Sequence, residues 1–343
     1  MKKVVCCFPE DLNVNFPVVP CSGWLKGKRL LLAATLLVMI MPLSATAQFV
    51  AKIASGSGSS IGPGGALYVT EGATGKILRV DPNSGQVTTY ASGLPPKIFD
   101  IGGAMDVAFI GATAYALVTL VGPDVGGTSV VGIYRVDGPN SFTIIADIGA
   151  FALSNPPSTP FFVDTGVQYS IEPYRGGFLV ADGHHNRVLN VERNGQISVV
   201  KAFGNIVPTG LAVSGNTVYL AQAGPTPHLP DDGKVVSFSL GSPAVTEVAS
   251  GARLLVDVEF GRGRTLYALS QGIWNGVAEG SPALPSTGEL VRVNGDGSFT
   301  VVASNLNQPT SLEFIGNAAF IVSLTGEIWR IEDVGNPPFG TSR

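Results

Sequence analysis

The chain contains three histidines, and all of them stand in segments rich in turn-forming residues. His184 and His185 lie between Asp182 and Asn186, and His228 follows in a second such segment. Imidazole nitrogens and carboxylate oxygens bind borderline metals such as zinc, so these residues are candidates for a metal or ligand site. No H-x-x-x-H or H-E-x-x-H spacing fixes the ligands. The alternative is that they are solvated turn residues, with Asp182 and Asn186 bonding their own backbone.

Other catalytic patterns are absent from the sequence. Gly75-Lys76 follows no G-x-x-x-x-G pattern, so no phosphate-binding loop is predicted. Ser270 is not part of a G-x-S-x-G nucleophile elbow. The cysteines Cys6, Cys7 and Cys21 all precede a predicted cleavage site, so the mature chain offers no thiol. The net charge of −4 and the charged fraction of 13% give no indication of nucleic-acid binding.

The elements that must position any site are short strands. In the stretch 176–204, an apolar run 178–182 ends in turn residues, and two further β-prone runs, 187–192 and 196–203, are separated by Asn194-Gly195. The Asn-Gly pair is a strong hairpin signal because both positions tolerate positive φ. This stretch therefore predicts three strands of an antiparallel meander.

The same strands recur through the whole chain. The outermost strand has six copies, the two before it have six each, and an innermost strand has five, its first copy near 55–63 having decayed into Gly and Ser. Four-stranded units of this size predict a six-bladed β-propeller. Because the last unit stops after three strands and an extra outer-strand copy (49–56) precedes all others, we expect 49–56 to complete the last blade and close the ring.

Loop lengths indicate which face of the ring binds. Connections after the first and third strands of each unit are short, whereas those after the second and fourth lengthen, at 121–132, 149–168, 224–233 and 272–288. Insertions in repeat proteins gather on the binding face, so the long-loop face is the predicted binding face. All three histidines fall there. Trp274 lies there too, where an aromatic ring would stack on a ligand or, alternatively, cover the adjacent blade.

Acidic residues recur on the innermost strands. Aligning the units places two layers of residues on one side of these strands, Asp106, Ser170, Gly210, Asp257 and Ser311 in the first and Ala108, Glu172, Ala212, Glu259 and Glu313 in the second. Carboxylates converging on the channel would coordinate a hard divalent cation, and Asp106, Glu172 and Asp257 are the candidate ligands. The alternative is that Asp106 and Asp257 accept hydrogen bonds from backbone N–H groups of neighbouring blades.

The N-terminus predicts export. Lys26, Lys28 and Arg29 precede an apolar run 30–43, and the small residues 45–47 supply a cleavage site, although an uncleaved anchor is the alternative. The expected organisation is a targeting segment at 1–47, a propeller at 48–336 and a tail at 337–343. The protein is then expected in the periplasm or outside the cell, without a stable membrane span after cleavage.

Two family resemblances add to this interpretation. Residues 179–182 with 186–188 resemble an NHL repeat, and the stretches 64–87, 172–191 and 225–238 resemble the ScyD/ScyE family of exported bacterial propellers. This resemblance implies the fold and export and carries no catalytic motif. The inner acids are similar to those of SMP-30/gluconolactonase-like propellers, where a metal assists lactone hydrolysis, but the accompanying asparagines are missing.

Two functions follow from these patterns. The first is an exported binding or scaffold protein whose long-loop face takes a protein, a glycan or a small aromatic molecule. The second is a metal-dependent hydrolase of the gluconolactonase type, with one Ca²⁺ or Zn²⁺ ion at the channel mouth. Whether the protein is an enzyme, and whether it has a cofactor at all, is left open by the sequence.

Overall fold

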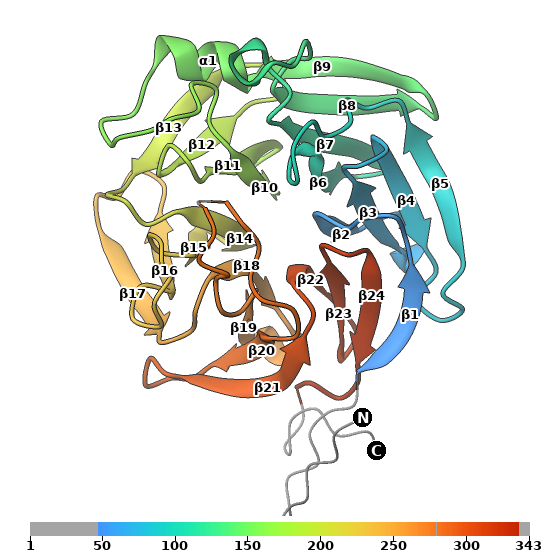
Figure 1. The fold of residues 1–343 in the computed structure, drawn as a ribbon, viewed down its shortest axis with the longest axis vertical. Helices are drawn as coiled ribbons and strands as arrows, with labels where there is room; N and C mark the ends of the chain where they lie inside the picture. Colours follow the sequence, from blue (N-terminus) through green and yellow to red (C-terminus); the bar gives the residue numbers. More distant parts are fainter. Residues whose placement is uncertain (1–46, 279, 336–343) are drawn as a thin grey trace, which may run out of the picture. The chain divides into compact units, whose positions relative to one another are not determined.

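The computed structural model describes residues 47–278 and 280–335. The predicted targeting segment lies outside these residues except for Ala47, and so does the tail 337–343. In the part that is described, no helix is long and apolar enough to cross a membrane. The described residues form six four-stranded antiparallel sheets arranged around a central channel, which confirms the predicted six-bladed β-propeller (Figure 1).

Each sheet runs from an inner strand at the channel to an outer strand at the perimeter. In that order the strands are β2 (Ser59–Ile61), β3 (Leu67–Glu71), β4 (Lys76–Val80) and β5 (Val87–Ser92); β6 (Gly103–Ile110), β7 (Thr113–Thr119), β8 (Gly132–Gly138) and β9 (Ser141–Asp147); β10 (Gln168–Tyr174), β11 (Gly177–Asp182), β12 (Arg187–Val191) and β13 (Ile197–Ala202); β14 (Pro208–Ser214), β15 (Thr217–Gln222), β16 (Lys234–Ser239) and β17 (Val245–Ser250); β18 (Leu255–Phe260), β19 (Leu266–Ser270), β20 (Gly288–Val293) and β21 (Phe299–Leu306); and β22 (Pro309–Ile315), β23 (Ala318–Ser323), β24 (Glu327–Ile331) and β1 (Gln48–Lys52).

The N-terminal strand completes the last sheet, as predicted. β1 pairs antiparallel with β24, with Phe49 opposite Trp329 and Ala51 opposite Ile328. The strand is shorter than predicted: it ends at Lys52, whereas the prediction extended to residue 56. Residues 53–58 then lead from the perimeter to β2 at the channel, which has only three residues. Gly and Ser have low strand propensity, which accounts for so short an inner strand.

The apolar core lies between neighbouring sheets. The second strand of a sheet, such as β11 or β23, is buried along its whole length because a neighbouring sheet covers each of its faces. Its sequence is therefore a nearly continuous apolar run. Outer strands such as β13 keep exposed residues. An aromatic pair recurs at three of the interfaces, with ring centroids 4.7–5.2 Å apart: Tyr68 with Phe109, Tyr219 with Phe260, and Tyr267 with Phe314.

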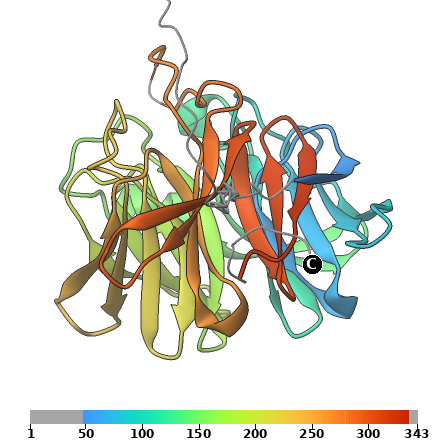
Figure 2. The same ribbon diagram turned by 90° about the horizontal axis from the view of Figure 1, so that it is seen from below.

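The long connections gather on one face of the ring, above the upper edge in Figure 2. The segment between β9 and β10 contains a short helix, α1 (Ile148–Ser154), which the sequence did not predict. Asp147 caps this helix by accepting a hydrogen bond from the backbone N–H of Ala150, at 2.8 Å. Three 3₁₀ turns, η1 (Pro63–Gly65), η2 (Pro123–Val125) and η3 (Arg262–Arg264), occupy other connections.

Candidate functional site

A cavity of about 860 Å³ opens on the long-loop face. Its floor is formed by residues of the six inner strands, and its walls come from the connections after the second and fourth strands. The walls are mainly apolar and include Phe99, Leu120, Phe161, Phe162, Val163 and Leu254. Several of these side chains remain exposed although they are large, with Phe162 at 65%. A cavity of this volume with apolar walls is typical of a small-molecule site.

The two predicted layers of polar residues form the floor of this cavity. Asp106, Ser170 and Asp257 stand at equivalent register positions, each directly opposite the corresponding residue of the second strand. Glu172 and Glu259 are equivalent in the same way. The acids of both layers line the cavity.

Asp106 and Asp257 hold neighbouring blades together. One carboxylate oxygen of Asp106 accepts from the N–H of Val107 at 2.8 Å, and the other accepts from Ile171, on the next inner strand, at 2.9 Å. Asp257 repeats this arrangement with Val258 and with Leu312, on the next blade. These hydrogen bonds are those expected under the alternative interpretation, in which Asp106 and Asp257 accept from backbone N–H groups of neighbouring blades.

Glycines on the preceding blades make room for these carboxylates. A Cβ atom on Gly58 would lie 2.1 Å from the nearer oxygen of Asp106, and one on Gly210 would lie 2.7 Å from that of Asp257. In the first layer, Gly210 stands at the position that Asp106 and Asp257 occupy on their own strands. The two aspartates are therefore fixed both by the blade ahead and by the blade behind.

The glutamates of the second layer have a different environment. Glu172, Glu259 and Glu313 line the cavity and are partly exposed, and their carboxylates repel one another. Burial, and then the charge of Asp257, raises the pKa of Glu172 to about 8. Burial also raises the pKa of Asp257 to about 7, and it raises the pKa values of Glu259 and Glu313 well above their ordinary value.

The candidate metal ligands do not fit a divalent cation. Each oxygen of Asp106 and of Asp257 accepts a hydrogen bond from a backbone N–H group, so these carboxylates are oriented by the backbone. Within residues 47–278 and 280–335, no three His, Cys, Asp or Glu side chains are placed to hold one ion. A hard cation such as Ca²⁺ requires six or more oxygen ligands with accessible lone pairs.

The predicted ligand-binding residues separate into two groups. His184, Asn186 and His228 line the cavity, and the ring of His184 packs edge-on against Phe162 with centroids 3.9 Å apart. The structure thus brings residues of two neighbouring blades to one cavity. Asp182 and His185 lie behind the wall instead, fully buried.

Trp274 is not part of the cavity wall. Its indole N–H donates to the carbonyl of Ala278 at 3.2 Å, and its ring lies 6.2 Å from that of His228. It also forms an isolated β-bridge with Ala283. Trp274 therefore braces the 272–288 loop and supports His228 from behind.

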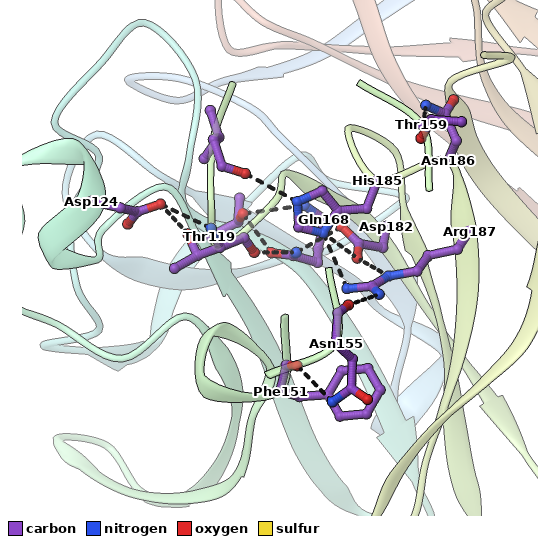
Figure 3. A network of polar contacts seen from close by, with 12 residues as sticks. Thr119, Asp124, Phe151, Asn155, Thr159, Gln168, Asp182, His185, Asn186 and Arg187 are labelled. Carbon is purple, nitrogen blue, oxygen red and sulfur yellow. Dashed lines mark hydrogen bonds and ion pairs between the residues drawn. The ribbon is translucent and has the colours of Figure 1, made fainter. Parts of the chain in front are cut away.

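A buried polar network surrounds Asp182 (Figure 3). One oxygen of Asp182 accepts from the side-chain amide of Gln168 at 2.9 Å, and the other accepts from Nε of Arg187 at 2.7 Å. Gln168 in turn accepts from Thr119 at 2.8 Å. Nε2 of His185 lies 3.0 Å from the carbonyl of Val163. Since a carbonyl only accepts, this contact fits the tautomer that carries its proton on Nε2.

Because of this network, Asp182, His185 and Asn186 are not the solvated turn residues that the sequence offered as an alternative. Asp182, His185 and Asn186 are at most 3% exposed, because the connection between β9 and β10 covers them. The side chain of Asn186 does not bond its own turn; its oxygen accepts from the backbone N–H groups of Ile206 and Val207, at 2.9 Å each. A solvated turn was expected because the covering segment is distant in sequence.

Arg187 is the important residue that the sequence analysis missed. Its guanidinium donates to the carbonyl of Asn155 at 2.6 Å as well as to Asp182, and it lies 5.5 Å from the ring centroid of Phe151. It thereby ties the 149–167 connection, which carries Phe161 and Phe162, to the third blade. The sequence signals were its place in the 186–188 stretch that resembles an NHL repeat and an arginine at the start of a mostly apolar strand, where a buried arginine requires an acid.

Comparisons with known proteins agree with this fold. No family model matches the chain, and no curated protein is significantly similar to it in sequence. A gluconolactonase from Xanthomonas campestris is 13% identical, with a TM-score of 0.58 over 83% of this chain and 89% of that one. A calcium-binding protein, regucalcin, from Agrobacterium tumefaciens is 12% identical, with a TM-score of 0.57 over 83% and 93%. Virginiamycin B lyase from Staphylococcus aureus is 12% identical, with a TM-score of 0.50 over 84% and 97%. At these identities the likeness shows the fold alone, and the similar structures include gluconolactonase-like propellers.

Proposed function

We propose that this protein binds a small molecule with an apolar or aromatic body in the cavity of the long-loop face. The observation that carries the proposal is the exposure of large apolar side chains around a deep cavity of about 860 Å³. Exposed apolar surface in contact with water is unfavourable, and a ligand that covers it gains binding free energy. The depth of the cavity favours a small molecule over a protein or a glycan, which bind flatter surfaces.

A metal-assisted hydrolase is the less well supported function. The floor acids and the fold shared with gluconolactonases favour it. The missing ligand set counts against a metal-dependent mechanism, because no three acidic or histidine side chains of the described residues are placed to hold one ion. The binding function requires no such ion.

Export and membership of the ScyD/ScyE family remain proposals. They rest on the apolar run 30–43 with its small-residue cleavage site and on the stretches 64–87, 172–191 and 225–238. A binding protein for a small aromatic molecule, located outside the cytoplasm, is consistent with both.

The proposal is tested with N-phenyl-1-naphthylamine, a neutral probe whose fluorescence rises in apolar surroundings. We expect saturable binding to the protein. Phe162→Ala removes exposed aromatic surface from the cavity wall, so we expect it to weaken binding about tenfold, or roughly 1.4 kcal/mol.

Phe49→Ala is the matched control. Phe49 is 52% exposed, similar to Phe162 at 65%, but it lies on the perimeter strand β1. Its substitution should leave the dissociation constant unchanged. If the probe does not bind, or if both variants weaken it equally, the cavity is not the binding site.

A further inference from the structure

The ionisable side chains on the cavity floor are all carboxyl groups. The cavity lining includes Asp100 at the rim and the five acids of the floor, Asp106, Glu172, Asp257, Glu259 and Glu313. Among the described residues that line it there is no Lys or Arg, and only His184 and His228 could add positive charge. An anionic ligand would find no partner here and would meet repulsion from the floor.

Several polar atoms on the floor have no partner in the described part of the chain. Glu172 and Glu313 accept no hydrogen bond there, and their pKa values are shifted by burial and by neighbouring carboxylates alone. Ser170 lines the same cavity, and its hydroxyl oxygen is buried without a hydrogen-bond partner. Glu172 and Glu313 are partly exposed to the cavity, so a ligand that donates hydrogen bonds there would be stabilised by these acceptors.

An organic cation suits these acceptors better than a metal ion. A metal requires several oxygens in a fixed polyhedron, and no three carboxylates of the described residues are placed to form one. An ammonium group does not require a full coordination polyhedron, so one or two nearby carboxylates are enough to bind it while the remaining floor acids attract its charge. Glu172, Glu259 and Glu313 stand on three different inner strands, β10, β18 and β22.

We infer that the ligand of this cavity is an organic amine, with its ammonium group near Glu172 and Glu313 on the floor and its apolar or aromatic body between the walls that carry Phe161 and Phe162. This inference rests on the proposed function, because it takes the cavity as the ligand site. Binding should release protons, since a cation favours the ionised form of carboxyl groups whose pKa values burial raises.

Three compounds with the same body test the inference by titration calorimetry: 2-(1-naphthyl)ethylamine, 2-(1-naphthyl)ethanol and 1-naphthylacetate. We expect the amine to bind at least about tenfold more tightly than the alcohol, and the acetate not to bind. The amine, but not the alcohol, should show an enthalpy that depends on the ionisation enthalpy of the buffer, because its binding releases protons.

Variants identify the acids involved. Glu172→Gln and Glu313→Gln each keep the shape of the side chain, and we expect each to reduce the preference for the amine to about threefold or less while the alcohol binds as before. Glu247→Gln is the control, since it removes one negative charge from the outer strand β17, outside the cavity, and should leave the preference intact. The two floor variants are independent, so one of them suffices if the other fails to fold.

The outcomes separate the two proposals. If the alcohol binds as tightly as the amine, the inference about the cation is wrong and the cavity remains the binding site. If neither compound binds, and N-phenyl-1-naphthylamine does not bind either, both proposals fail. Stoichiometric binding of Ca²⁺ alone, lost in Glu172→Gln, would assign the floor to an inorganic cation and overturn the inference.

Discussion

The carboxyl group of Glu172 shows how the channel couples stability to pH. Burial raises its pKa from 4.5 to about 8, with the charge of Asp257 as the second cause. Between these values the folded protein holds a proton that the unfolded chain has lost. The stabilisation is therefore complete below the unfolded pKa and is lost as the pH rises through the folded pKa. Asp257, Glu259 and Glu313 face the same space and act in the same direction.

We predict that Glu172→Gln flattens this loss of stability. The amide carries no charge at any pH, so the variant should unfold with a free energy similar to that of the parent near pH ~4 and higher by roughly 1–3 kcal/mol near pH ~8.5. Urea unfolding at a series of pH values measures the difference. Glu247→Gln is the control: Glu247 is exposed, and hydrogen bonds from Lys234 and Ser250 lower its pKa, so its substitution should not flatten the curve. A parent protein whose stability rises over this interval would contradict the assignment.

The sequence predicted the acids of the floor but not how each is used. Alignment of the repeats gave the correct equivalence of Asp106 with Asp257 and of Glu172 with Glu259. It left open whether the aspartates bind a ligand or the backbone of the next blade, because that depends on where Ile171 and Leu312 present their N–H groups. Distances between blades are a property of the assembled ring and have no local sequence signal.

At the scale of an element, the connection between β9 and β10 forms part of the cavity wall and depends on Arg187. The guanidinium joins Asn155 of this connection to Asp182 of the third blade, and His185 adds the contact with Val163. Asp124 accepts from both the backbone and the hydroxyl of Thr165, at 2.9 Å each. The wall that carries Phe161 and Phe162 is thus fixed at both ends.

We predict that Arg187→Met destabilises the protein by about 3 kcal/mol, because the charge of Asp182 is then buried without a cation. Backbone amides in residues 155–165 should exchange with solvent faster, which hydrogen-exchange mass spectrometry measures. The control is Arg135→Met, which breaks an exposed ion pair with Asp137 and should cost less than about 1 kcal/mol. Arg187→Lys keeps the charge and should be intermediate. Equal effects at positions 187 and 135 would show that the network does not hold the wall.

Most elements were predictable because each strand is repeated, so that six weak signals support one another. There are two exceptions. α1 occurs in one connection only and has no repeat, and the alignment of the outer strands placed β1 three residues too far along the chain. In the structure Ala51, not Ala54, takes the place of Ala91, since Ala51 pairs with Ile328 as Ala91 pairs with Ile77. Sequence similarity favoured an outer strand that includes residues 54–56. In the structure residues 53–58 are needed to connect β1 at the perimeter with β2 at the channel.

For the whole molecule, the closing strand joins the two ends of the ring. β1 is the outer strand of the last blade, and the same stretch of chain then begins the first blade at β2. The side chains of Ser59 and Ser311, from β2 and β22, also meet at 2.8 Å across this boundary. A closed ring leaves no sheet interface uncovered, so damage at the closure should affect blades on both sides of it.

Ala51→Pro and Ala91→Pro make the same change at equivalent, buried positions of two outer strands. We predict that the first destabilises blades on both sides of the closure, whereas the second destabilises only its own blade. Proline removes a backbone N–H and disrupts the local ladder in both variants. In β5 the loss should remain within β4 and β5, because the ring stays closed. In β1 it releases the closing strand, so hydrogen exchange should also accelerate in β24, β22 and β2, and thermal unfolding should begin at a lower temperature than in Ala91→Pro. If exchange changes only within β1 and β24, the ring does not depend on its closure, and each blade is stable largely through its immediate neighbours.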